Sequence, residues 1–164
     1  MITASTDDLL AYLADVIEVV ERFGATVLPP NEGEEVQWAR EGDDLVMDIG
    51  TRLPTPRGSQ DVDLVLQERW SPRAPGQWIR VEYGYDLRDH ELGYRRAFHR
   101  HDADHFVRAW DVATHEHCEA TLGYPVCGHY AGEPAADAID GFLRLYGIWL
   151  ANTKPDCSKF HRLG

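Results

Sequence analysis

The sequence predicts an α+β domain, because helical periodicity occupies its two ends and strand periodicity its middle. Apolar residues recur every three to four positions in 6–24 and again in 134–152. Between 44 and 115 they alternate with polar residues, in segments separated by short polar turns. We therefore expect one domain spanning residues 1–164, with an antiparallel sheet of about five strands and both helices packed on one face.

The N-terminal helix has a start signal and a stop signal. Ser5 or Thr6 can cap it, Asp7 and Asp8 follow in its first turn, and Gly24 can end it. Its apolar stripe consists of Leu9, Leu13, Val16, Val20 and Phe23. The C-terminal helix is mostly apolar, at Ala138, Ile139, Phe142, Leu143, Leu145, Tyr146 and Trp149.

Five strands are predicted between the helices. Alternation of apolar and polar residues places them at 44–53, 61–70, 78–87, 92–101 and 106–115. The last three are joined by short turns, which is typical of an antiparallel meander.

The composition narrows the classes of protein. With 43% hydrophobic and 27% charged residues, the chain is ordinary for a globular domain. No apolar run approaches the roughly 20 residues that span a bilayer, and the N-terminus lacks the basic region of a signal peptide. The net charge of −12 argues against a nucleic-acid partner unless basic side chains cluster locally. The three cysteines cannot all pair within one chain, so we expect reduced thiols, a cytoplasmic location and no membrane partner.

Strand alternation divides the middle of the chain into two faces. If turns at 88–90 and 102–104 set the register, one face is apolar and takes the helices. The other mixes arginine, histidine and carboxylate side chains with glycine and alanine, and so suits a flat substrate or an RNA backbone. The alternative is a solvated face of ion pairs, such as Arg95 with Asp111, that add little stability. This second face comprises Arg80, Glu82, Asp86, Arg95, Ala97, His99, His101, Ala109, Asp111, Ala113, His115 and His117.

One predicted strand carries the residues for acid–base chemistry without a metal. His99 and His101 can act as general base and general acid, because imidazole titrates near neutral pH. Arg95 would hold a phosphate and stabilise developing negative charge, while Arg80 and Asp111 bind the substrate. The alternative is that a His-x-His pair at a sheet edge has no catalytic role.

A second group has the composition of a zinc site. Zinc takes four nitrogen or sulfur ligands in tetrahedral geometry, and a Gly-Tyr-Pro turn can bring the two halves of this group together. The candidate ligands are His115, His117, Cys118, Cys127 and His129. On a straight strand this group would lie about 30 Å from His99 and His101. The alternative is that the cysteines are small buried residues and the histidines are ordinary polar residues at strand ends.

Three segments resemble the TumE-type toxins of prokaryotic toxin–antitoxin systems. They are Tyr83-Gly84-Tyr85, Arg95-Arg96-Ala97-Phe98-His99-Arg100-His101 and Thr114-His115-Glu116-His117-Cys118. The resemblance implies a small toxin that acts on RNA and is neutralised by a cognate antitoxin protein.

Three functions therefore compete. The first is a toxin-like, metal-independent ribonuclease that uses Arg95, His99 and His101 on the sheet face. The second is a non-enzymatic zinc-binding domain. The third is a module whose polar face binds a protein partner.

Overall fold

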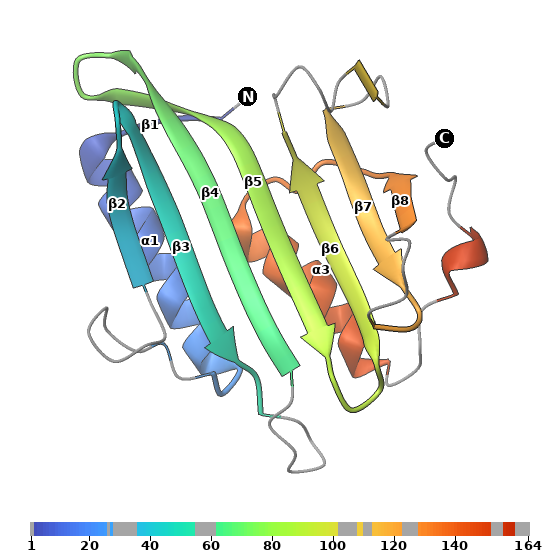
Figure 1. Cartoon of the computed structure of the whole chain (residues 1–164). Coiled ribbons are helices and arrows are strands. Elements are labelled where there is room, and N and C mark those ends of the chain that lie inside the picture. Colours follow the sequence, from blue (N-terminus) through green and yellow to red (C-terminus); the bar gives the residue numbers. More distant parts are fainter. Residues whose placement is uncertain are drawn as a thin grey trace.

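The computed structural model is an open antiparallel sheet with two helices on one face, which confirms the predicted α+β class (Figure 1). In the part of the chain that is described, no helix is long and apolar enough to cross a lipid bilayer. The described residues are 2–25, 27, 36–54, 62–101, 108–109, 113–122, 128–151 and 156–159.

The sheet contains more strands than the roughly five expected from alternation. The order along it is β2-β3-β4-β5-β6-β7-β8, with β1 paired to β5, and every pairing is antiparallel. The additional strands β1, β2 and β8 are short, so alternation gives little signal for them. The bounds are β1 Thr3–Ser5, α1 Thr6–Arg22, β2 Val36–Glu41, β3 Asp44–Arg52, β4 Val62–Ala74, β5 Gln77–Asp89, β6 Tyr94–Arg100, β7 Thr114–Glu119, β8 Gly128–Ala131, α3 Ala138–Leu150 and the short 3₁₀ helix η1 Cys157–Lys159.

The predicted strand at 106–115 is wrong. Within it, the described residues Arg108 and Ala109 are helical, and β7 begins only at Thr114. The amide of His101 donates to the carbonyl of Ala113 at 3.0 Å, and the pairing of β6 with β7 follows from there. This change of register decides where the histidines lie.

Side-chain caps fix both helices. Ser5 caps α1: its hydroxyl accepts from the amide of Asp8, whose carboxylate accepts from the amide of Ser5, each at 3.2 Å. Asp137 caps α3, accepting from the amide of Asp140 at 2.8 Å. The predicted start at Pro134 was therefore a few residues early.

The core lies between the sheet and the two helices. Val20 of α1, Phe142 and Leu145 of α3, and Tyr85 of β5 are all fully buried in it. Each such side chain contributes about 1.5–3 kcal/mol relative to exposure. Helix α3 comes so close to the sheet at Gly141 that a Cβ there would overlap the ring of Tyr85.

A β-bulge reverses the alternation near the start of β5. Arg69 pairs with Glu82, but the next residue, Trp70, pairs with Arg80, so Val81 is an extra residue in β5. The prediction that Arg80 lies on the open face is wrong for this reason. Its side chain lies beneath the sheet and is 7% exposed.

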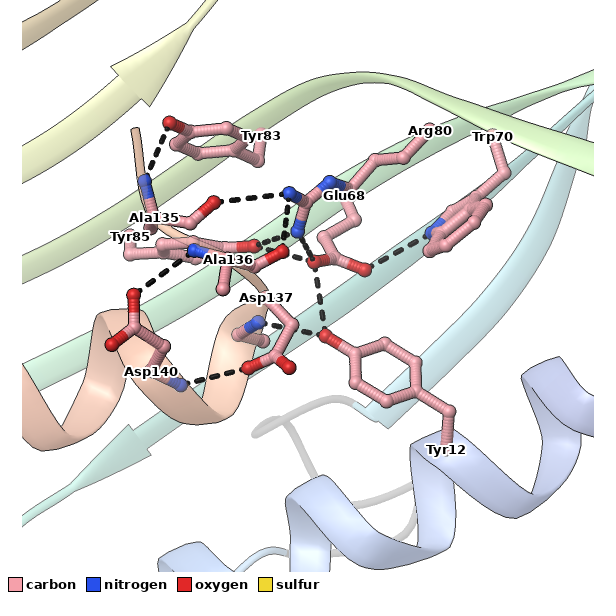
Figure 2. A network of polar contacts seen from close by, with 11 residues as sticks. Tyr12, Glu68, Trp70, Arg80, Tyr83, Tyr85, Ala135, Ala136, Asp137 and Asp140 are labelled. Carbon is pink, nitrogen blue, oxygen red and sulfur yellow. Dashed lines mark hydrogen bonds and ion pairs between the residues drawn. The ribbon is translucent and has the colours of Figure 1, made fainter. Parts of the chain in front are cut away.

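Beneath the sheet, the carboxylate of Glu68 accepts hydrogen bonds from four side chains (Figure 2). Arg80 Nη1 donates at 2.8 Å, and Tyr12 Oη and Trp70 Nε1 donate at 3.0 Å each. The hydroxyl of Tyr85 also donates to Glu68. Burial, together with the charge of Glu68, raises the pKa of Tyr12 and of Tyr85 well above the usual range. The network joins α1 to the sheet.

The same network reaches the start of α3. Arg80 Nη2 donates to the carbonyls of Ala135 and Ala136 at 3.1 and 2.7 Å (Figure 2). Burial opposes the charge on Arg80, but Tyr85 and Glu68 raise the pKa of its guanidinium, so Arg80 keeps its charge beneath the sheet. Arg80 is thus a structural residue rather than a residue of the open face.

A disulfide connects β7 to η1. Cys118 and Cys157 are bonded, with their Cα atoms 5.7 Å apart, and they are separated by 39 positions in the sequence. The expectation of reduced thiols is therefore wrong for these two cysteines. Cys127 lies outside the described residues.

Candidate metal centre

Strand pairing brings the two predicted histidine groups together. His99 in β6 lies directly opposite His115 in β7, and His117 lies opposite Ala97. All of them share the open face with Gly84 and Asp86 of β5, which are the partners of His99 and Ala97. The predicted separation of about 30 Å is therefore wrong, because it assumed an unbroken strand through 106–115.

Four imidazoles form one cluster. One ligand nitrogen from each of His99, His101 and His115 lies within 4.8 Å of those of the other two. His117 lies beside two of them: its ring centroid is 4.4 Å from that of His99, and its Nε2 is 3.1 Å from Nε2 of His115. The four histidines are called the histidine cluster below.

The nitrogen spacing is near that of a metal site. At a zinc–nitrogen distance of about 2.0–2.1 Å, tetrahedral geometry separates two ligand nitrogens by roughly 3.4 Å. The 3.1 Å between His115 and His117 is close to this value. To hold a metal together, His99, His101 and His115 would have to bring their nitrogens, which lie within 4.8 Å of one another, to this separation. These three side chains form a group that can hold a metal ion.

The histidine cluster is closed at one end and open at the other. His115 and His117 are 1% and 6% exposed. This part of the sheet face was expected to be open to solvent, but it is buried. His99 and His101 are half-buried and line a cleft of about 560 Å³. A metal held by the cluster would therefore be reached from the cleft side.

The predicted sulfur ligand does not reach the cluster. Cys118 is paired with Arg96, whose partner Leu87 belongs to the core, so Cys118 lies on the helix-covered side of the sheet. Its sulfur is also bonded to Cys157. Both observations contradict its expected role as a zinc ligand.

The other two predicted ligands, Cys127 and His129, cannot be placed by their side chains within the described residues. The backbone of His129 pairs with His117 in β8, but its side chain lies outside the described residues, as does Cys127. The predicted substrate-binding residue Asp111 also lies outside them.

Arg95 lies on the open face as predicted, but between carboxylates. Its Nε donates to Asp86 at 2.8 Å and its Nη1 donates to Glu119 at 2.9 Å. Its side chain is 15% exposed. A phosphate could bind Arg95 only in competition with these carboxylates, which disfavours the predicted role as a phosphate holder.

The floor of the cleft is lowest at Gly84, in the middle of the sheet. Gly84 has no side chain, and a Cβ there would lie 3.7 Å from Nε2 of His99. The imidazole of His99 therefore leans over β5 and into the cleft. Residues lining the cleft include Asp48, Gln67, Gly84, Arg95, His99 and His101.

Sequence reasoning missed Asp48 and Gln67 as members of this surface. Both alternate outward in their predicted strands, and Gln67 Nε2 donates to Asp48 at 2.9 Å. The alternation could have identified them, but only with the strand order β3-β4-β5-β6, which brings them towards the histidines.

No family model, curated protein or solved structure matches this chain. The residues and geometry of the site therefore carry the functional argument.

Proposed function

We propose that this protein binds a zinc ion through His99, His101 and His115. The observation that carries the proposal is the convergence of three imidazoles with ligand nitrogens within 4.8 Å: His99 of β6, His115 opposite it in β7, and His101 directly after the end of β6. Imidazole is a borderline donor that suits zinc, and strands β6 and β7 hold His99 and His115 more rigidly than loops would. Three histidine ligands leave the fourth position of the metal for water or substrate.

His117 would act as a supporting residue or as an alternative ligand. Its Nε2 lies 3.1 Å from that of His115, so one ring donates a hydrogen bond to the other when no metal is bound. A metal on Nε2 of His115 would compete with this bond. Substitution of His117 is therefore expected to change metal affinity less than substitution of His115.

The test is metal titration of purified protein. Zinc content is measured by mass spectrometry, and cobalt(II) is titrated as a visible-absorption reporter. We expect one metal per chain. His115→Ala should lower affinity by more than about 100-fold, since even outer-shell changes cost about 10–100-fold. His90→Ala is the matched control, because His90 lies outside the cluster and contacts Asp63 at 2.8 Å. Absence of stoichiometric zinc and cobalt, or equal losses in both variants, would refute the proposal.

The metal-independent ribonuclease is a second candidate, favoured by the proximity of His99 and His101 on the cleft. Their ring centroids are 5.4 Å apart and both side chains are half-buried, so one could take a proton from a bound substrate while the other gives one to the leaving group. The carboxylates around Arg95 count against RNA. RNA cleavage by metal-free protein, lost in His99→Ala, together with growth arrest on expression, would support this candidate and the toxin resemblance.

A further inference from the structure

We propose that the cleft binds an elongated molecule with a metal-ligating group at one end and a protonated amine at the other. The inference rests on the proposed zinc site and names the class of ligand that the site takes. It depends on three features of the open face: a row of residues across four strands, the pairing of the cleft's arginines, and the carboxylate of Asp48.

The row gives the cleft its length. Asp48, Gln67, Gly84 and His99 are successive register partners in β3, β4, β5 and β6. Three strand spacings of about 4.8 Å place the two ends of the row roughly 14 Å apart. Gly84 adds no side chain of its own, so the imidazole of His99 can lean over it while an extended ligand lies across the rest of the row.

The arginines of the cleft are neutralised by carboxylates. Arg69 forms ion pairs with Glu41 at 2.7 Å and with Asp44 and Glu82 at 3.3 Å each. Arg88 lies 3.5 Å from Asp86, which also binds Arg95. An anionic ligand would have to displace these carboxylates, so the cleft disfavours phosphates.

Asp48 differs from the other carboxylates of the cleft. Within the described residues, its hydrogen-bond partner is the neutral amide of Gln67 at 2.9 Å, and no ion pair to it is found. It is half-buried, so its charge is less screened than that of an exposed carboxylate. This end of the row therefore attracts a cation.

The two ends of the row have opposite charge when the metal is bound. A divalent metal at His99 binds a carboxylate or another electron-pair donor, while Asp48 binds an ammonium group. A molecule with both groups at the right separation satisfies both ends, whereas a dicarboxylate of the same length places an anion against Asp48. The cleft thus selects by charge as well as by length.

The experiment uses full-length protein loaded with cobalt(II) and three probes of matched chain length: 8-aminooctanoate, octanoate and suberate. Changes in the visible absorption of cobalt report ligation, and calorimetry gives the affinities. We expect 8-aminooctanoate to bind about fivefold more tightly than octanoate, which corresponds to about 1 kcal/mol for a partly exposed ion pair. Suberate should bind more weakly than both.

Asp48→Asn should remove the preference for 8-aminooctanoate. The control is Asp15→Asn, which changes the net charge equally but lies at an exposed position of α1 outside the cleft. Cobalt binding with equal affinities for the three probes, or equal effects of the two variants, would overturn the ligand assignment and leave the metal site standing. Failure to bind cobalt would overturn both.

Discussion

The buried ion pair between Arg80 and Glu68 should be among the largest single contributors to stability. The side chains are 7% and 0% exposed, and Nη1 lies 2.8 Å from Oε1. Arg80→Met leaves Glu68 charged beneath the sheet without a cation. It also removes the donor to the carbonyls of Ala135 and Ala136. Breaking one partner of a buried pair costs about 3–5 kcal/mol, a large part of the roughly 5–15 kcal/mol of a typical domain.

The double variant Arg80→Met/Glu68→Leu separates the charge effect from lost packing. A buried pair replaced by apolar side chains is often close to neutral, so the double variant should be no less stable than Arg80→Met alone. The coupling energy between the two positions should then reach about 3 kcal/mol. Because Tyr12 and Tyr85 also lose their acceptor, some cost should remain.

The assay is urea unfolding at pH 7, followed by circular dichroism and tryptophan fluorescence. Arg52→Met is the control, since Arg52 lies 3.4 Å from Asp63 with both side chains well exposed, at 60% and 40%. An exposed pair contributes about 0–1 kcal/mol. Arg80→Lys, which keeps the charge, should lose less stability than Arg80→Met. A loss below about 1 kcal/mol in Arg80→Met, matching the control, would refute the reasoning.

Three further outcomes follow from the same packing. Gly141→Ala should lower the free energy of unfolding in urea by about 1–3 kcal/mol, because its Cβ would overlap Tyr85. Gly147→Ala should raise it by about 0.5–1 kcal/mol, because a Cβ there has nothing within 4 Å. Equal effects of the two variants would contradict the packing. Removing the Cys118–Cys157 disulfide by a Cys157→Ser change should cost up to about 4 kcal/mol from the 39-residue loop, and an unchanged urea midpoint would contradict it. Burial and the charge of Glu68 raise the pKa of both Tyr12 and Tyr85, so the folded protein keeps two protons that the unfolded chain loses above about pH 10. Stability is full below that pH and should fall by about 1.4 kcal/mol per pH unit above it for each of the two tyrosines, and a flat alkaline profile would count against the network.

The fold class and the faces of most strands could be predicted from the sequence because they depend on local periodicity. Alternation correctly places Tyr85 and Phe98 in the core and His99 on the opposite face. The Ser5 cap is equally local. Such features are encoded within a few residues, so no knowledge of the tertiary structure is needed.

The wrong predictions arose at two kinds of position: where one extra residue changes which face of the sheet the following side chains occupy, and where a connection between strands changes how they pair. The extra residue Val81 moves Arg80 from the open face to the core side, and no sequence signal marks that bulge. The connection before Thr114 moves His115 next to His99. Both depend on which strands pair, and a one-residue slip moves every following side chain to the other face. The buried network around Glu68 was missed because its partners Tyr12, Arg80 and Tyr85 come together only when α1 packs on the sheet.

Alternate residues of β4 and β5 belong to the buried network on one face of the sheet and to the cleft on the other. Variants on the two faces should therefore affect ligand binding in different ways. Glu68 and Tyr85 lie beneath the sheet, while their neighbours Gln67 and Gly84 form the cleft floor. A change in the buried network would therefore weaken ligand binding only by loosening the floor, and the loss should track unfolding free energy. A change at Asp48 should alter the choice between ligands without that correlation. The ratio of two affinities in one variant, rather than either affinity alone, thus distinguishes residues of the cleft from residues that support it.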